Sequence, residues 1–229
     1  MLGTIVNSIA IIIGALLGNL LKQGIPERIK ETIMQGIGLA VLLIGISMTL
    51  ETNNVLIIIL SLVIGGVVGE KLKIEEKLDT LGSWLERKAG QEKGDVAKGF
   101  VTASLVYCVG AMAIMGALES GLTGQHNTLY AKSALDGITS IIFASSMGLG
   151  VAFSSIPVFL YQGSITLGAS LIKGFLNDAV VTEMTATGGL LILGIGINML
   201  GLKKIKVGNL LPAIFAAILV TIVIDRLPI

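Results

Sequence analysis

The sequence has little charge, few aromatic residues and almost none of the residues from which catalytic and metal sites are most often built. Charged residues make up 14% of the 229 residues, aromatic residues make up 4%, and there is one histidine and one cysteine. A single cysteine excludes a disulfide framework, and no pair of His or Cys residues has the spacing of a metal-ligand set. One loop histidine, His126, cannot be combined with Ser and Asp into a catalytic triad. We therefore expect no enzyme activity, no bound metal and no cofactor.

Apolar residues, in contrast, form 53% of the chain, at a mean hydropathy of +0.91. A soluble domain carries about 25% charged residues, and here the few charges are bunched, so that residues 55–69 and 137–171 contain none. Such windows match the roughly 20 residues that a helix needs to cross a bilayer. The net charge of +1, without a basic patch that contains aromatic residues, gives no indication of a nucleic-acid partner. We predict an all-α polytopic integral membrane protein in a lipid bilayer, with about eight transmembrane helices at residues 3–21, 27–50, 54–72, 96–118, 130–150, 155–173, 179–200 and 207–224.

One stretch of the chain occurs twice. Residues 38–48 read G-L-A-V-L-L-I-G-I-S-M and residues 189–199 read G-L-L-I-L-G-I-G-I-N-M, so seven of eleven positions are identical at an offset of 151. In this alignment Ser47 corresponds to Asn198, and both are small and polar. About 70 residues at each end of the chain are therefore predicted to be copies of one three-helix unit.

The positive charges are distributed unevenly between the loops. If eight helices cross the membrane, one side holds thirteen Lys and Arg residues and the other holds three, Lys132, Lys173 and Arg226. Cytoplasmic loops collect Lys and Arg, so both termini are predicted to lie outside. The first copy of the repeat then starts from outside and the second from inside, which makes the two repeats inverted. Inverted repeats are typical of alternating-access transporters, although some channels and structural proteins also have them.

Residues 73–98 have a different pattern. Ile74, Leu78, Leu81 and Leu85 recur at helical spacing with charged residues between them, and Trp84 lies alongside. This pattern predicts an amphipathic cytoplasmic helix on the membrane surface, followed by a charged linker; a helix that docks a partner is the alternative. We therefore divide the chain into a first repeat (1–72), this helix and linker (73–98), a central polar helix pair (99–154) and a second, inverted repeat (155–229).

Two pairs of glycines indicate close contacts between helices. Gly14 and Gly18 lie about one turn apart in the first predicted helix, and Gly65 and Gly69 do so in the third. Small residues at this spacing let two helix backbones approach each other. Packing within the chain is the favoured interpretation, and a homodimer through the Gly-x-x-x-Gly faces is the alternative.

Polar residues on three central helices indicate where a solute or ion could pass. On the predicted helices 96–118, 130–150 and 155–173 they recur on one face. The alternative for the hydroxyl residues is that they bond back to carbonyls of their own helix. Together with Ser47 and Asn198, the candidates for a substrate or ion pathway are Ser104, Cys108 and Glu119 on the first helix, Ser133, Asp136, Thr139 and Ser140 on the second, and Gln162 and Thr166 on the third.

Asp136 is the most informative of these candidates. A carboxylate at the centre of a bilayer costs about 2.5–3.5 kcal/mol on insertion scales, so it is expected inside a helix bundle or a cavity. It lies near the outer end of its helix, where Glu119, His126 and Lys132 would share the same mouth. Two interpretations are open: a proton or cation relay, and a solvated rim at which Asp136 pairs with Lys132.

Three segments resemble a known family. They are G-T-I-V-N (3–7), G-F-V-T-A-S-L-V-Y-C-V-G-A-M-A-I-M-G (99–116) and T-L-Y-A-K-S-A-L-D-G-I-T-S-I-I-F-A-S (128–145). The chain resembles the YqgA/YdfK-like family of bacterial inner-membrane proteins, a domain of unknown function, over essentially its whole length. The resemblance implies a multi-pass protein of the bacterial plasma membrane and a transporter or channel role. It brings no substrate and no catalytic residue, and Glu119, Asp136 and Gln162 fall in its characteristic blocks.

The expected function is gradient-driven or passive movement of a small solute or ion across the membrane, by a transporter whose substrate the sequence does not specify. The alternatives are a membrane channel, and a membrane-embedded scaffold or sensor that acts through the amphipathic helix at residues 74–89. Nothing in the sequence resembles a nucleotide-binding domain, so transport driven by ATP is not expected.

Overall fold

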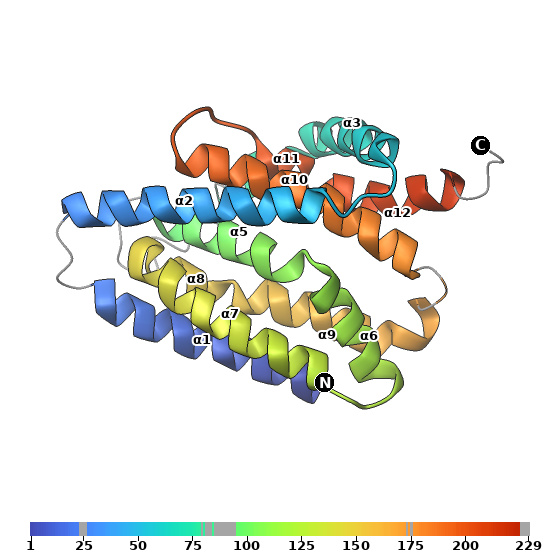
Figure 1. The fold of residues 1–229 in the computed structure, drawn as a ribbon, viewed down its shortest axis with the longest axis horizontal. Coiled ribbons are helices and arrows are strands. Elements are labelled where there is room, and N and C mark those ends of the chain that lie inside the picture. The colour runs from blue at the N-terminus through green and yellow to red at the C-terminus, as the bar shows by residue number, and fades with distance from the viewer. Residues whose placement is uncertain are drawn as a thin grey trace. The chain divides into compact units, whose positions relative to one another are not determined.

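The computed structural model describes residues 1–22, 27–78, 80, 84, 95–172, 174 and 176–224, and within this part of the chain every regular element is a helix (Figure 1). The predicted all-α fold class is therefore confirmed. In chain order the helices are α1 (Leu2–Lys22), α2 (Glu27–Thr49), α3 (Val55–Leu72), α5 (Asp95–Cys108), α6 (Ala111–Leu122), α7 (Asn127–Met147), α8 (Gly150–Phe153), α9 (Ser155–Ile172), α10 (Asp178–Met199), α11 (Val207–Leu210) and α12 (Pro212–Ile224).

Six described helical stretches are long and apolar enough to cross a membrane, and a seventh exists if α5 and α6 form one bent span. The predicted span 96–118 is broken, because α5 and α6 meet at an angle of 58° next to Gly110, whose φ of +148° suits glycine alone. α7 is not among the six, since its charged and hydroxyl side chains lower its hydropathy. The count of eight spans is thus not confirmed.

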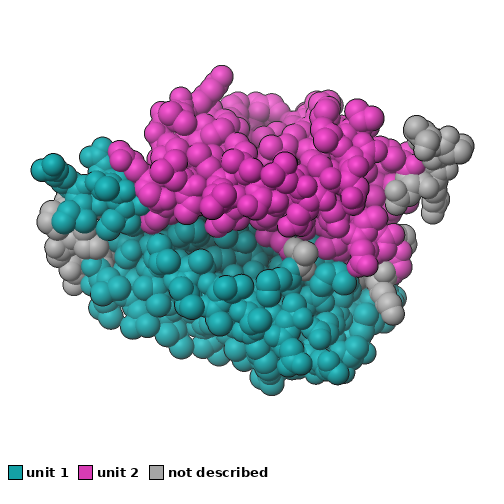
Figure 2. Space-filling model, in the orientation of Figure 1, with its two compact units in different colours: residues 1–34, 78–108, 112–172 teal, residues 35–77, 109–111, 173–229 magenta. Residues whose placement is uncertain are grey.

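The chain forms two compact units (Figure 2). Unit 1 comprises residues 1–34, 78–108 and 112–172, and unit 2 comprises residues 35–77, 109–111 and 173–229. Each unit therefore combines segments from distant parts of the sequence. Unit 1 contains α1 and α5 to α9, and unit 2 contains α3, α10, α11, α12 and most of α2.

The packing of unit 1 depends on close contact between α1 and α7, which lie side by side (Figure 1). A side chain placed on Gly14 would overlap the carbonyl oxygen of Gly137, and one placed on Gly18 would overlap that of Ile141. Both glycines of the first Gly-x-x-x-Gly pair are thus covered within the chain. This is the intramolecular packing that the sequence favoured, and a homodimer through the same face would have to displace α7.

In unit 2, the two copies of the duplicated stretch pack against each other. A Cβ built on Gly45 would lie 2.6 Å from the backbone nitrogen of Leu193, and one built on Gly196 would lie 2.8 Å from the side chain of Leu42. At the offset of 151, Gly45 corresponds to Gly196 and Leu42 corresponds to Leu193. The contact between α2 and α10 is therefore reciprocal: the glycine of each copy packs against the equivalent leucine of the other copy.

The second Gly-x-x-x-Gly pair is also covered within unit 2. A Cβ on Gly65 would lie 2.6 Å from the Cβ of Ala213, and one on Gly69 would overlap the backbone of Asn209. α3 therefore packs along α11 and α12, which run antiparallel to it.

Most of the predicted amphipathic helix at residues 74–89 lies outside the described residues. Its first residues, 74–78, are helical, and Trp84 is 48% exposed. The start of this helix is tied to the beginning of α11: the Gly208 amide donates to the Glu75 carboxylate at 2.6 Å, and the Glu75 amide donates to Asn209 Oδ1 at 2.8 Å.

The glycine contact of unit 1 predicts different costs for two equivalent substitutions. Gly14→Ala should lower the free energy of unfolding by about 1–3 kcal/mol, because the new methyl group would overlap the α7 backbone. Gly168→Ala is the matched control, since no atom lies within 4 Å of its Cβ position and alanine favours a helix by about 1 kcal/mol. Thermal unfolding in detergent measures both, and equal melting temperatures for the two variants would contradict the packing.

Candidate functional site

The buried face of α7 carries the polar side chains that the sequence singled out. Lys132, Ser133, Asp136 and Ser140 are all buried, and they recur at spacings of one to four residues along one side of the helix. Asp136 is 5% exposed and Lys132 is 7% exposed. Two ionisable side chains at these depths require compensation within unit 1.

Asp136 is compensated by two partners. The Lys132 ammonium lies 3.0 Å from both carboxylate oxygens, one turn earlier in the same helix. From α1, the Nδ2 amide of the fully buried Asn7 donates to Oδ2 at 3.0 Å. The charge of the carboxylate is neutralised by Lys132, and α1 is fastened to α7 by the amide.

The pairing of Asp136 with Lys132 was one of the two interpretations open from the sequence, but its setting differs from the one expected. The pair does not form a solvated rim, because the side chains of Lys132 and Asp136, taken without their backbone atoms, are only 9% and 7% exposed. A buried pair of this kind resists disruption strongly, since removing one partner leaves the other charge unpaired.

The hydroxyl groups of α7 have partners of two kinds. Ser133 donates to the carbonyl of Leu129 at 2.6 Å, and Thr139 donates to that of Leu135 at 2.7 Å, so both bond back to their own helix. Ser140 instead lies 2.9 Å from the hydroxyl of Tyr107 on α5. No local sequence pattern indicates this role of Tyr107, whose buried ring also stacks on Phe143 with the ring centroids 6.2 Å apart.

A further set of buried polar atoms in unit 1 has no hydrogen-bond partner among the described residues. Gln162 on α9 is the clearest case, because its side chain is 0% exposed and neither its Oε1 nor its Nε2 is paired. Such a group costs roughly 1–3 kcal/mol when it stays unpaired. We call the following residues of α1, α6 and α9 the interior polar cluster, since each is buried and has an unpaired side-chain atom: Thr4, Asn7 and Ser8 on α1, Ser120 on α6, and Gln162 and Thr166 on α9. Ser146 on α7 is likewise buried with an unpaired hydroxyl, but it lies outside these three helices.

The packing contacts of α9 show which way Gln162 and Thr166 face. Gly163 faces the start of α1, since a Cβ built on it would lie 3.4 Å from the Met1 side chain. Ala169 faces α6, since its Cβ lies 2.5 Å from the position that a Cβ on Gly121 would take. Successive residues of a helix are about 100° apart, so Gln162 and Thr166 lie on the arc between these two contacts.

The packing contacts of α1 show in the same way which side of that helix carries Thr4 and Ser8. Gly3 and Gly14 face α7, where they approach Leu129 and Gly137, while Met1 faces α9. Thr4 and Ser8 lie on the arc between these two directions. They therefore lie on the side of α1 between its contacts with α7 and with α9.

On α6, Gly116 faces Leu129 of α7 and Gly121 faces Thr166 of α9. Ser120 lies on the shorter arc between these two contacts. The unpaired polar groups of α1, α6 and α9 thus lie on helix sides that face other helices of unit 1, and Asn7, whose amide holds Asp136, is one of them.

The remaining candidates from the sequence lie elsewhere or have local roles. Ser104 and Glu119 are half-buried, each with one unpaired buried oxygen, and Cys108 is a half-buried free thiol. Ser47 and Asn198 belong to unit 2. Ser47 is exposed, and Asn198 exchanges two hydrogen bonds with the backbone of Ile205, which closes the turn after α10.

Glu183 in unit 2 is a buried carboxylate that was not among the candidates. It accepts hydrogen bonds from the Thr52 hydroxyl at 2.6 Å and from the backbone amides of Asn53 and Asn54 at 2.8 and 3.2 Å. These amides lie at the start of α3, where a helix favours negative charge. Glu183 therefore fixes the beginning of α3.

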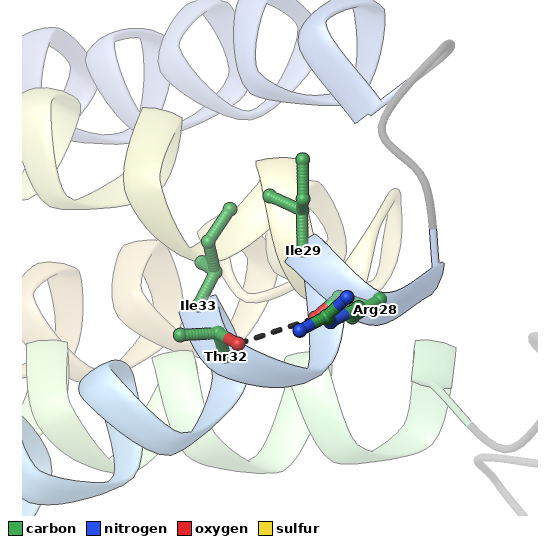
Figure 3. Close-up of a pocket in the computed structure, with 4 residues that line it drawn as sticks. All are labelled: Arg28, Ile29, Thr32 and Ile33. Carbon is green, nitrogen blue, oxygen red and sulfur yellow. Dashed lines mark hydrogen bonds between the residues drawn. The ribbon is translucent and has the colours of Figure 1, made fainter.

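A surface hollow of about 500 Å³ lies outside the interior polar cluster, at the start of α2 (Figure 3). It is lined by Arg28, Ile29, Thr32 and Ile33, and the Thr32 hydroxyl donates to the Arg28 carbonyl at 3.2 Å. Its described lining comes from two turns of one helix and is mainly apolar. No group of three His, Cys, Asp or Glu side chains in the described residues could hold a metal ion.

Comparison with known proteins places this arrangement in a family. The model of a family described as "Protein of unknown function (DUF554)" matches residues 2–222. The chain belongs to this family. The DUF554 relatives include the "Uncharacterized membrane protein YdfK" of Bacillus subtilis (strain 168), which is 36% identical over 228 residues, or 98% of this chain and 97% of the relative.

A second relative is the "Uncharacterized protein YqgA" of Escherichia coli (strain K12), which is 32% identical over 221 residues, or 94% of each chain. The resemblance inferred from the sequence is confirmed by these matches. No solved structure matches this DUF554 chain.

The buried ion pair predicts strongly non-additive mutations. Asp136→Asn and Lys132→Met should each lower the free energy of unfolding by about 3–5 kcal/mol, because each leaves a buried charge without its partner. The double variant should lose less than the sum, since no uncompensated charge is left. Reversible unfolding in detergent would measure all three.

Lys73→Met is the control for this cycle. Its ammonium lies 3.4 Å from Glu76, and the two side chains are 67% and 71% exposed, so the change should cost about 0–1 kcal/mol. Additive losses in the Lys132–Asp136 cycle would show that the two charges do not depend on each other.

Proposed function

We propose that this membrane protein moves a small solute or ion across the bilayer, without chemical change, through the interior polar cluster of unit 1. The observation that carries the proposal is Gln162, a fully buried amide whose oxygen and nitrogen are both unpaired. In a membrane protein, polar groups are expensive to bury and mark binding sites or pathways when they have no structural partner. Asn198, Glu183, Ser133 and Thr139 have such partners, and Gln162 does not.

The reciprocal packing of α2 on α10 supports an inverted repeat. When a two-fold axis relates two copies, any contact between residue A of the first copy and residue B of the second also occurs between residue B of the first copy and residue A of the second. The Gly45–Leu193 and Gly196–Leu42 contacts have this property. Inverted repeats allow two alternative arrangements of similar energy, which a gradient-driven or passive transporter requires.

We further propose that the chain lies in a bacterial plasma membrane with both termini outside. Both relatives are bacterial, and one is named a membrane protein. The excess of Lys and Arg on one set of loops, at thirteen to three for eight crossings, favours this orientation.

A ligand screen tests the function. Purified protein in detergent should gain melting temperature with at least one small solute or ion, because a ligand that binds only the folded state stabilises it. The gain should be absent in Gln162→Leu and retained in Gln125→Leu, a matched change at an exposed loop position. If no small molecule shifts the wild type, or if Gln162→Leu responds fully, the interior polar cluster is not the binding site.

Orientation has its own test. With Cys108 replaced by Ser, single cysteines at the exposed positions Glu51 and Gln125 should react with a membrane-impermeant maleimide in intact cells. A cysteine at Gln91 should react only after permeabilisation. Labelling of the Gln91 position in intact cells would reverse the orientation.

A further inference from the structure

We propose that the interior polar cluster binds an uncharged polar solute that both donates and accepts hydrogen bonds, such as a polyol or a urea-like amide. In this proposal the Gln162 amide donates one hydrogen bond to the solute and accepts another from it. This inference rests on the proposed function, since it assigns the class of solute to the same site. It follows from the charge of the cluster and from the kinds of atoms that are left unpaired.

The interior polar cluster carries no charge of its own. None of the six side chains of the interior polar cluster is ionisable. Of the charged groups near it, Lys132 and Asp136 neutralise each other across 3.0 Å, and Glu119, next to Ser120, is half-buried and not part of the cluster. A buried ion needs compensation by an opposite charge or by many oriented dipoles, and neither charge of this pair is free to supply it.

Gln162 has both kinds of unpaired atom, a donor and an acceptor. Gln162 offers one acceptor, Oε1, and two donors on Nε2, none of which is used. A cation would satisfy the oxygen and leave the nitrogen unpaired, and an anion would do the reverse. Only a ligand with both donors and acceptors satisfies the whole amide.

Asn7 adds an oriented acceptor to the cluster. Because a carboxylate only accepts hydrogen bonds, Asp136 fixes Asn7 with Nδ2 toward α7, at 3.0 Å. The Asn7 Oδ1 is left buried and unpaired. The hydroxyls of Thr4, Ser8, Ser120 and Thr166 can each donate or accept, and so adapt to a polyol or an amide.

Flux into proteoliposomes tests the inference. Vesicles that contain wild-type protein are mixed with glycerol or urea in a stopped-flow light-scattering assay, and with NaCl or KCl while internal ion indicators are followed. Glycerol or urea entry should exceed that of protein-free vesicles, and ion entry should not. Gln162→Leu should reduce the entry of the uncharged solute at least tenfold, and Thr166→Val, which removes one unpaired hydroxyl and preserves shape, should reduce it several-fold.

Gln125→Leu, at an exposed position, is the control and should transport like wild type. Size-exclusion profiles and melting temperatures of all variants are recorded, so that loss of folding is separated from loss of flux. Gln162→Leu should melt no lower than wild type without solute, because it removes unpaired buried polar atoms.

The outcomes separate this inference from the proposed function. Ion flux that is lost in Gln162→Leu, without flux of either uncharged solute, keeps the transport function and overturns the solute class. Glycerol or urea flux that Gln162→Leu leaves unchanged overturns the role of the cluster alone. If no solute or ion enters faster than in protein-free vesicles, the proposed function fails and the inference with it.

Discussion

A polar group that enters the core of a bilayer must find its hydrogen-bond partner inside the protein, because lipid tails offer none. Nearly every local feature of the structure follows from this constraint. Ser133 and Thr139 return to their own helix carbonyls, Asp136 is shared by Lys132 and Asn7, and Glu183 is held by two backbone amides at the start of α3. Several buried hydroxyls, among them Thr185 and Thr187 on α10, have no partner among the described residues, but Gln162 is the fully buried amide in which both the oxygen and the nitrogen are unpaired, and the proposed site rests on it.

Close backbone contact is what allows the polar pairs to form at all. The Asn7 side chain is short, and it reaches Asp136 because α1 and α7 approach each other at Gly14 and Gly18. Without that approach, Asn7 would not reach the Lys132–Asp136 pair, and α1 would not shield the pair from lipid and water. In unit 2, glycines on α2 and α10 have the same effect on packing, but none of the salt bridges found among the described residues lies at that contact.

The sequence predicted well what depends on composition and spacing, and less well what depends on distant partners. The apolar windows correctly indicated α1, α3 and α12, and the polar faces correctly indicated that Asp136, Gln162 and Thr166 lie inside. Asn7 was missed because its partner lies 129 residues away, and no local pattern encodes that distance. The break at Gly110 was missed because the sequence does not distinguish a glycine that allows close helix packing from a glycine that ends a helix. Nor could spacing reveal which hydroxyls bond back to their helix, since that depends on side-chain rotamers.

The ion pair and the neutral cluster are connected by the orientation of a single amide. Lys132 neutralises Asp136, so the carboxylate can remain buried, and the carboxylate in turn decides which end of Asn7 faces α7. The consequence is that the Lys132–Asp136 pair lies on the Nδ2 side of Asn7, while the Oδ1 side presents a fixed, uncharged acceptor. Fixed dipoles that need no rearrangement bind a ligand at a lower entropic cost than mobile ones. A buried pair of opposite charges can therefore serve an uncharged solute, because its role is to orient the neighbour that the solute meets.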